Sequence, residues 1–291
     1  MRKLIVILLF PFLFACSPTE ENADLEIHFI DVGYGDAVLL KNAQSRAILI
    51  DTGYPEARAK LIAYLRKQKV DELEHLIVTH PHPDHLGNAV AVLTEFKANN
   101  LRDNGQALDH FDERLTEQLA HEYEEEFRGR PSYRVLSAGD KIEWGSSRLD
   151  VLWPEDVTSG GDWNTNSLLI RLSCGKLRAL LAGDFNRGGE IQILRQEGLN
   201  LKSDLLKVGH HGAGDATGET FLKAVSPRWA VISVGENPWG YPSAGVLQRL
   251  RESGAEVFRT DRDGSIIFRY LPSGEIEILA SGKVRREMLP R

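Results

Sequence analysis

The chain has 291 residues, of which 42% are hydrophobic and 26% are charged. This is the composition of an ordinary globular protein, and it excludes a disordered, collagen-like or polytopic membrane chain. The 35 basic and 42 acidic residues give a formal net charge of −7, which repels polyanions such as nucleic acids at long range.

The N-terminus has the layout of a signal peptide, which we place at residues 1–15. Arg2 and Lys3 precede an apolar run that is shorter than the roughly 20 residues of a membrane-spanning helix. Residues 13–16, Leu-Phe-Ala-Cys, resemble a lipobox, in which Cys16 would be lipidated and become the first residue of the mature chain. We therefore expect an exported protein of the periplasm or cell envelope that this lipid anchors to the membrane. Plain secretion is the alternative.

The polar and acidic residues 16–24 predict a short tether between the membrane and a folded domain. If Cys16 carries a lipid, Cys174 has no partner, so we expect no intramolecular disulfide. Removal of residues 1–15 would take away two basic residues and no acidic ones, which leaves a formal net charge of −9.

Short aliphatic runs of strand length recur along the rest of the chain. They occupy residues 26–31, 37–40, 47–50, 75–79, 148–153, 168–172, 177–182, 204–208, 229–234, 265–270 and 276–280. Segments 55–68 and 243–253 have the apolar spacing of helices, and residues 144–154 resemble a hairpin. Two strand-rich halves with interspersed helices predict an α/β protein in which two sheets pack together and are flanked by helices. We expect a single domain over residues 25–285 and a tail over residues 286–291.

The segment 109–128 is rich in glutamate and predicts an exposed helix beside the catalytic half. A solvated helix face explains this run of charge better than a recognition element does. The negative charge of the helix could still exclude polyanionic substrates.

A histidine-rich hexapeptide, His-Pro-His-Pro-Asp-His over residues 80–85, directly follows a predicted strand. Three imidazoles and a carboxylate are costly to place beside a core unless each polar group has a partner, and a metal ion provides one. His80 and His82, which are two residues apart, can point together at one ion. Asp84 and His85 can turn toward a second ion. The alternative, a solvent-exposed histidine-rich turn, is disfavoured by this spacing.

The hexapeptide resembles the HxHxDH signature of the metallo-β-lactamase superfamily, and further positions match that family in the expected order. The resemblance implies that Asp51 supports the metal loop and that Asp184 bridges two metals. It also implies that His211, or its neighbour His210, is the last histidine ligand. Asp51 and Asp184 each follow an aliphatic run, where α/β proteins place functional groups, although either alone would suit a turn or a helix cap. The implied fold is an αββα four-layer sandwich with two divalent metal ions.

A narrower resemblance covers nearly the whole mature chain. Residues 29–37, Phe-Ile-Asp-Val-Gly-Tyr-Gly-Asp-Ala, are similar to the opening motif of the hydrolase domain in ComEC-type DNA-internalisation competence proteins. Further similarity lies in residues 166–168, 206–212, 231–235 and 259–261. Those competence proteins are polytopic membrane channels, and we expect this chain to be a freestanding relative of their hydrolase domain.

Five positions depart from the ComEC-type pattern: Tyr34 in place of Gln, His82 in place of Asp, Asn88 in place of Gly, Ala213 in place of Ser and Tyr241 in place of His. His82 moves the first metal site toward the nitrogen ligation of zinc, and manganese is the alternative. Tyr241 leaves the substrate chemistry open. Asn166 and Ser167 stand where zinc β-lactamases use an isolated histidine as a third ligand, which disfavours a β-lactam substrate.

The family resemblance implies hydrolysis by a hydroxide that forms when two metals lower the pKa of a shared water toward about 7. Asp84 would contribute to catalysis as well as to metal binding. His210, Tyr241 or Asn166 would orient the substrate or protonate its leaving group. The ComEC-type resemblance favours a phosphoester or phosphodiester substrate, DNA included, although the net charge opposes nucleic-acid binding. A lactonase or esterase and a noncatalytic binding lipoprotein are the alternatives, and no protein partner can be inferred.

Overall fold

The computed structural model describes residues 22–108, 116–157 and 162–289. The predicted signal peptide over residues 1–15, the predicted lipidation site at Cys16 and most of the predicted tether lie outside these ranges. Within the ranges, no helix has both the length and the apolar character that crossing a membrane requires.

The first sheet has nine strands in the order β16-β15-β14-β1-β2-β3-β4-β5-β6. They are β1 (Leu25–Phe29), β2 (Val38–Asn42), β3 (Ala47–Ile50), β4 (Glu72–Ile77), β5 (Lys97–Asp103), β6 (Tyr133–Val135), β14 (Ile266–Tyr270), β15 (Glu275–Ala280) and β16 (Lys283–Met288). The strands from β3 to β6 run parallel to one another, whereas the other neighbours are antiparallel. The carboxyl ends of β3 and β4 therefore lie side by side.

The second sheet has seven strands in the order β13-β12-β11-β10-β9-β8-β7. They are β7 (Lys141–Trp144), β8 (Ser147–Trp153), β9 (Leu169–Cys174), β10 (Leu177–Leu181), β11 (Leu205–Lys207), β12 (Trp229–Ile232) and β13 (Glu256–Arg259). The strands from β10 to β13 are parallel, and β7, β8 and β9 form an antiparallel extension. This sheet also brings the carboxyl ends of neighbouring strands, β10 and β11, together.

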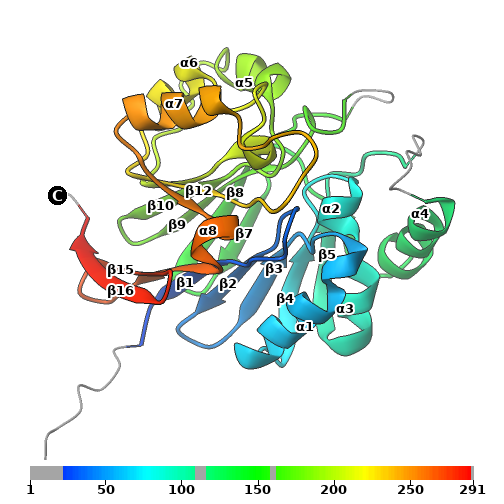
Figure 1. Ribbon diagram of the computed structural model, residues 1–291. Helices are drawn as coiled ribbons and strands as arrows, with labels where there is room; N and C mark the ends of the chain where they lie inside the picture. The colour runs from blue at the N-terminus through cyan, green and yellow to red at the C-terminus, as the bar shows by residue number, and fades with distance from the viewer. Residues whose placement is uncertain (1–21, 109–115, 158–161, 290–291) are drawn as a thin grey trace, which may run out of the picture.

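Helices cover the outer face of each sheet (Figure 1). Those beside the first sheet are α1 (Arg58–Lys67), α3 (Ala89–Glu95) and α4 (Glu117–Tyr123), which continues as η2 (Glu124–Arg128). Those beside the second sheet are α5 (Arg187–Ile193), α6 (Glu219–Val225) and α7 (Ala244–Glu252). Four short helical turns complete the described chain: η1 (Pro55–Ala57), α2 (Pro83–Leu86), η3 (Gly209–Gly212) and α8 (Thr260–Asp263).

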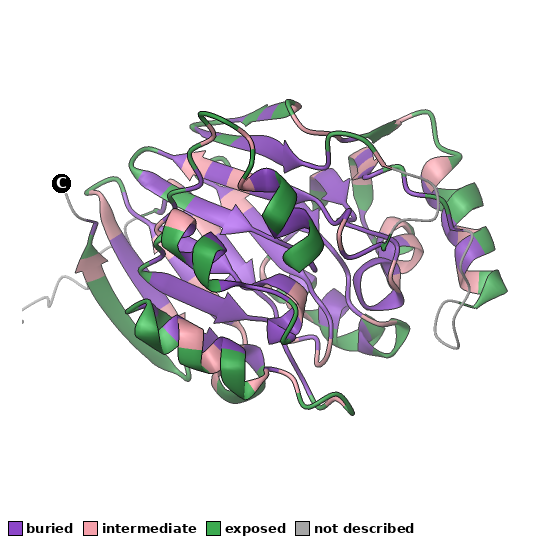
Figure 2. Ribbon diagram, turned by 90° about the horizontal axis from the view of Figure 1, so that it is seen from above, coloured by how far each residue is buried: buried purple, intermediate pink, exposed green. Residues whose placement is uncertain are grey.

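Three apolar clusters hold these layers together. The cluster between the two sheets includes Trp144, Trp229 and Phe268. A second cluster joins the first sheet to its helices, for example through Leu61 of α1, and a third joins the second sheet to α5, α6 and α7. In Figure 2 most strands are buried, the edge strand that leads to the C-terminus is exposed, and the helices expose their outer faces. The order helix, sheet, sheet, helix confirms the predicted four-layer α/β sandwich.

Some elements differ from the predicted ones. β5, β6, β13 and β16 were not predicted, and β16 extends to Met288, past the domain end expected at residue 285. The described part of the predicted acidic helix is helical: Thr116 caps it by accepting a hydrogen bond from the backbone nitrogen of Leu119 at 3.1 Å. Tyr123 and Phe127 on its inner face are buried, so this helix is attached to the body by its own apolar stripe.

Phe268 on β14 tests the packing between the sheets, because its ring contacts the rings of Phe29, Phe258 and Trp229. We expect Phe268→Ala to lower the free energy of unfolding by about 3–5 kcal/mol, because the variant loses a fully buried ring and leaves a cavity. Chemical denaturation measures this change. Val284→Ala, at a residue that is 60% exposed on the edge strand β16, is the control and should lower stability by less than about 1 kcal/mol. Equal losses in the two variants would contradict a close-packed interface.

Candidate metal centre

The predicted ligands lie in loops that follow the parallel strands. β4 leads into residues 80–85, β10 leads into Asp184, and β11 leads into His210 and His211. β3 ends directly before Asp51. Because β3 and β4 are parallel neighbours in one sheet, and β10 and β11 are parallel neighbours in the other, all of these loops meet at one edge of the sandwich. The two halves of the chain therefore assemble the site together.

Asp51 anchors the hexapeptide loop from the neighbouring strand. Its Oδ1 accepts a hydrogen bond from the backbone nitrogen of Thr79 at 2.7 Å, and its Oδ2 accepts one from Thr79 Oγ1 at 2.9 Å. Nδ1 of His85 lies 2.8 Å from the same Oδ2. This contact fixes the imidazole ring, so that Nε2 of His85 faces Asp184 Oδ1 at 3.2 Å. Asp51 adopts a φ of 60°, a left-handed conformation that aspartate tolerates better than most residues.

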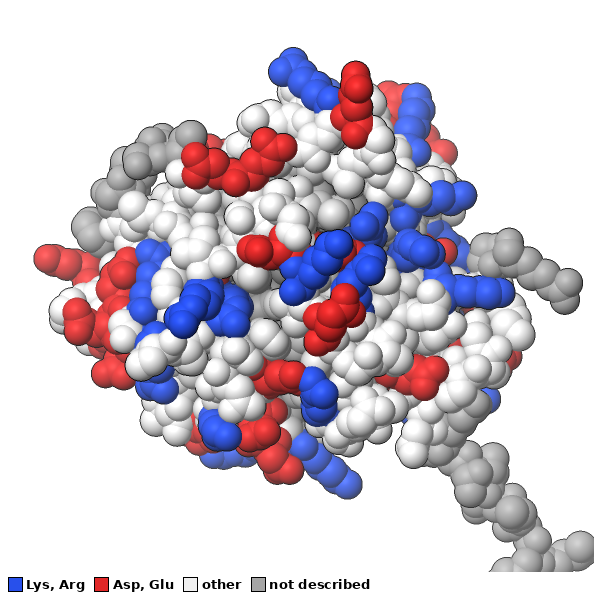
Figure 3. Space-filling view, turned by 180° about the vertical axis from the view of Figure 1, so that it is seen from behind, with Lys and Arg blue, Asp and Glu red and all other residues white. Residues whose placement is uncertain are grey.

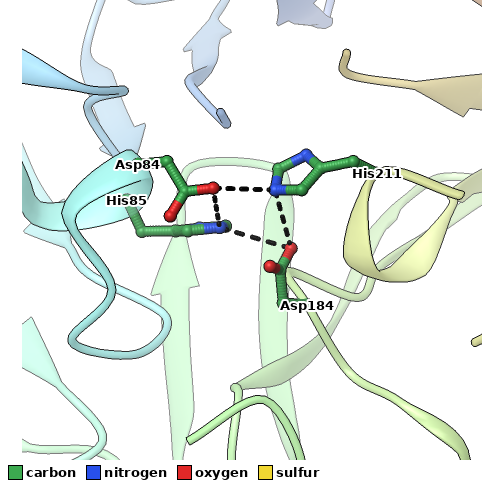
Figure 4. Close-up of side chains that lie close together, drawn as sticks. All are labelled: Asp84, His85, Asp184 and His211. Carbon is green, nitrogen blue, oxygen red and sulfur yellow. Dashed lines mark hydrogen bonds and ion pairs between the residues drawn. The ribbon is translucent and has the colours of Figure 1, made fainter. Parts of the chain in front are cut away.

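Four buried side chains converge at the centre of this edge (Figure 4). They are Asp84, His85, Asp184 and His211, and their ligand atoms lie within 4.8 Å of one another. Nε2 of His211 is 3.0 Å from Asp84 Oδ2 and 3.3 Å from Asp184 Oδ1. Its Nδ1 lies 2.9 Å from the backbone oxygen of Ser233, which holds the ring in this orientation. These residues could surround one cation with two imidazole nitrogens and two carboxylates.

Asp184 also belongs to a second group. With His80 and His82 it forms another set of ligand atoms that lie within 4.8 Å of one another. Oδ2 of Asp184 is 3.9 Å from Nε2 of His80, whereas Oδ1 of Asp184 faces the first group. The two oxygens of one carboxylate therefore point into two neighbouring groups, which is the arrangement of a bridging ligand.

A third group is formed by Asp36, Asp51 and His85. Its positive charge comes from a neighbouring side chain, the ammonium group of Lys207. Nζ of Lys207 forms an ion pair with Asp36 and donates a hydrogen bond to the backbone oxygen of Gly183 at 2.7 Å. Lys207 is only 1% exposed, so this is a buried ion pair. The third group shares His85 with the first group, and Lys207 holds the chain next to Asp184.

The electrostatics of the site match those of a cation site. Burial lowers the pKa of His80 well below 6.5, and the nearby His85 lowers it further, so His80 is a neutral imidazole at pH 7. Burial also disfavours charge on His211, but Asp184 and Asp84 outweigh it and raise the pKa of His211 to about 10. The carboxylates thus require positive charge, and a divalent ion would replace the protons of the rings that face them.

Two buried atoms of the first group, Nε2 of His85 and Oδ1 of Asp184, form an ion-pair contact at 3.2 Å but meet no hydrogen-bond criterion with any described residue. Both atoms face the space between the four side chains of Figure 4, so the residues fit a metal ion there.

His210 and His211 occupy a strained turn. Their φ angles of 45° and 50° lie in the left-handed region, which costs non-glycine residues about 1–3 kcal/mol each. The turn directs His211 into the first ligand group. His210 remains at the rim, with Nδ1 3.3 Å from Asp215 Oδ1 and Nε2 3.9 Å from Asp184 Oδ2. Of the two histidines that the sequence left open, His211 is the one whose ring lies in the first group, and His210 lies outside all three groups.

The other predicted catalytic residues differ in position. Tyr241 lies beside His210, with ring centroids 5.6 Å apart, and lines the cleft above the ligands. Asn166 is absent from the described lining of this cleft; it is buried, and its backbone oxygen accepts a hydrogen bond from Asn104 at 2.9 Å. Asn164 instead lies near the rim histidine, with Nδ2 3.3 Å from His210 Nε2.

Sequence reasoning did not identify Asp36, Lys207, Tyr34 or Trp239 as site residues. A signal existed for Lys207, because a lysine inside an aliphatic run of strand length is rarely buried without a partner. Tyr34 and Trp239 line the cleft above the ligands, and their spacing in the sequence gives no indication of this position.

The Lys207–Asp36 pair can be tested through stability. We expect Lys207→Met to lower the free energy of unfolding by about 3–5 kcal/mol, because the carboxylate of Asp36 loses its cation while it remains buried. Adding Asp36→Asn should restore much of the loss, because the double variant buries no unpaired charge. Denaturation in the presence of a chelator measures both variants without any contribution from metal binding. A double variant less stable than Lys207→Met would contradict the pairing.

Comparisons with a family model and with known proteins point to the same family. The sequence model of the metallo-beta-lactamase superfamily matches residues 30–236. ComE operon protein 3 of Bacillus subtilis (strain 168) is 30% identical over 278 residues, which cover 89% of this chain and 34% of that protein. Competence protein ComA of Neisseria gonorrhoeae is 29% identical over 243 residues, which cover 82% of this chain and 31% of that protein. This chain spans about a third of the length of these relatives.

A solved structure agrees at the level of the fold. YhfI from Bacillus subtilis, a metallo-beta-lactamase fold protein, superposes with a TM-score of 0.51 at 13% identity, over 84% of this chain and 98% of that chain. At this identity the match shows the shared fold alone. The matched family extends over both sheets and over the loops that carry the ligand groups. This chain therefore belongs to the metallo-beta-lactamase superfamily, and its predicted resemblance to ComEC-type competence proteins is confirmed.

Proposed function

We propose that the protein is a metal-dependent hydrolase with a dinuclear site, and that it acts on phosphoesters or phosphodiesters. One observation carries this proposal: the two carboxylate oxygens of Asp184 face two separate groups of ligand atoms. A carboxylate shared by two such groups has the layout of a two-metal hydrolase, in which both ions act on a single substrate.

Both ligand groups would take part. His80, His82 and Asp184 would hold one ion, and the four residues of Figure 4, which include the same Asp184, would hold the other. Imidazole nitrogens combined with carboxylate oxygens suit zinc, which we propose as the metal, with manganese as the alternative. When bound, the ions would lower the pKa of a water and neutralise the negative charge that develops on the substrate.

The residues of the chain would position the ligands and supply a proton. Asp51 orients His85 through its hydrogen bond. At the rim, burial disfavours charge on His210, but Asp184 and the hydrogen bond to Asp215 raise its pKa. A protonated His210 at this position can donate a proton from Nε2 to the oxygen of the leaving group. Tyr241, whose ring lies against His210, would orient the substrate.

The distribution of charge favours a small ester over DNA. The cleft above the ligands holds about 170 Å³, and its described lining contains no Lys or Arg. Nucleic-acid binding draws much of its affinity from contacts between such side chains and phosphates. On the face shown in Figure 3, Lys and Arg side chains are interspersed with Asp and Glu side chains. We therefore propose a small phosphoester or phosphodiester, with a lactone or carboxylic ester as the second candidate because it needs no basic side chain.

The first test combines metal content with turnover of bis(4-nitrophenyl) phosphate. We expect the purified protein to carry about two divalent ions per chain by elemental analysis and to hydrolyse this diester. Asp184→Ala should lose metal and at least about 100-fold in kcat/KM, because both groups lose their shared carboxylate. Asp71→Ala, which removes an exposed carboxylate outside the site, is the matched control and should retain both properties.

Each other outcome has a definite meaning. Bound metal without turnover of the diester, but with hydrolysis of lactones or carboxylic esters, would replace the phosphoester proposal by the second candidate. Absence of both metal and turnover would contradict the enzyme and leave a noncatalytic binding protein.

A further inference from the structure

The cleft above the ligands continues into a larger outer cavity of about 690 Å³. Tyr34, Tyr54 and Trp239 line both spaces, so the two are contiguous. An ester bound over the ligand groups would meet the outer cavity at these three rings. The lining of the outer cavity therefore selects the part of the substrate that points away from the bond to be hydrolysed.

Aromatic rings form one continuous wall along this path. The ring centroid of Tyr34 lies 6.0 Å from that of Tyr54 and 4.9 Å from that of Trp239, which in turn lies 5.9 Å from Tyr241. Tyr34 also lies 4.5 Å from the ring of His211, so the wall begins at the ligand group itself. Aromatic faces carry negative electrostatic potential and attract a cation within about 6 Å of the ring centroid.

Three carboxylates accompany this wall in the outer cavity, namely those of Glu56, Glu122 and Glu236. The described lining contains no Lys or Arg. Glu56 and Glu236 form no ion pair with any residue in the described ranges, and Glu122 accepts a hydrogen bond from Gln118 at 2.8 Å. The outer cavity thus combines electron-rich rings with negative charge that no described side chain neutralises.

We propose that the outer cavity binds an organic ammonium group, so that the substrate is an ester with a cationic substituent next to the bond that is hydrolysed. This inference rests on the proposed hydrolase function and adds the substrate class. A quaternary or methylated ammonium is weakly hydrated and broad enough to contact several rings at once, and the carboxylates that line the same cavity attract its charge. A phosphodiester of this kind is zwitterionic, which suits a cleft that combines a cation centre with an acidic approach.

Other substituents fit the cavity less well. A nucleobase would stack on the same rings, but the neighbouring phosphates of a nucleic acid would face Glu56, Glu122 and Glu236 without a described basic partner. A neutral hydrocarbon group would gain from the rings alone and would make no use of the carboxylates. The ammonium group uses both features of the cavity.

The test compares two esters that differ in one charge. In 4-nitrophenyl phosphorylcholine the cation is a trimethylammonium group, and in 4-nitrophenyl 3,3-dimethylbutyl phosphate a tert-butyl group of the same shape replaces it. We expect kcat/KM to be at least about tenfold higher for the cationic ester, with most of the difference in KM, and to fall toward the neutral value at high salt. Equal kcat/KM values for the two esters would overturn the proposal.

Variants connect this preference to the cavity. Glu236→Gln and Trp239→Leu should each lower the ratio of the two kcat/KM values at least about threefold, because one removes a carboxylate and the other an aromatic face. Glu197→Gln removes an exposed carboxylate outside the cavity and should leave the ratio unchanged. Glu236 is itself exposed, so Glu236→Gln keeps the test valid if Trp239→Leu does not fold. A ratio that is insensitive to both cavity variants would place the recognition elsewhere and contradict the proposal.

Two further comparisons separate the possible failures. Hydrolysis of the neutral ester without any preference for the cationic one would refute the ammonium site and leave the hydrolase proposal standing, whereas hydrolysis of neither ester would refute the phosphodiester substrate on which the ammonium site rests. The source of the ammonium group is resolved by comparing soluble glycerophosphocholine with phosphatidylcholine vesicles. Choline-containing product from the soluble diester alone indicates a water-soluble substrate, and product from the vesicles indicates a lipid headgroup; turnover of neither natural ester would contradict the proposal.

Discussion

Burial of four carboxylates at one edge of the sandwich is the constraint on which the rest of the site depends. They are Asp36, Asp51, Asp84 and Asp184, and each is at most 6% exposed. A buried carboxylate costs several kcal/mol unless a positive charge or several hydrogen bonds compensate it. Lys207 compensates Asp36, and Thr79 and His85 compensate Asp51. Asp84 and Asp184 face imidazoles, and their requirement for positive charge makes this edge of the protein a place for divalent ions.

The fold satisfies this requirement by combining its two sheets. Parallel strands β3 and β4 bring the hexapeptide loop next to Asp51, and parallel strands β10 and β11 bring Asp184 next to His211. The two groups that share Asp184 contain residues from both halves of the chain, so neither half can form them alone. Metal binding would therefore stabilise the closed sandwich, because a site that exists only in the folded protein contributes its binding free energy to folding.

Local patterns predicted the parts of the structure that depend on neighbours in the sequence. The hexapeptide and the aliphatic runs that precede Asp51 and Asp184 could be recognised because each is formed by consecutive residues. β5, with the sequence Lys-Ala-Asn-Asn-Leu-Arg-Asp, lacks an apolar run and forms because it pairs with β4 on one side and β6 on the other. Lys207 and Asp36 are far apart in the sequence, so their ion pair was invisible until the sheets brought them together. The sequence likewise could not show that Asn164, and not the predicted Asn166, lies near His210, because this depends on how one loop turns at the rim.

The difference between local motifs and contacts made by the fold also separates the proposed metal ligands from the residues that would determine specificity. The residues that would bind metal stand in short motifs at strand ends. The spaces above the ligands are lined by side chains from other loops, such as Tyr34 and Trp239 in both spaces and Glu56 in the outer cavity, and the ring of Tyr34 lies 4.5 Å from that of His211. Tyr34 is a departure from the ComEC-type pattern, and its ring joins the ligand group to the aromatic wall. A change at such a position would reshape the cleft while the proposed ligand set stays the same, so specificity can vary on an unchanged fold.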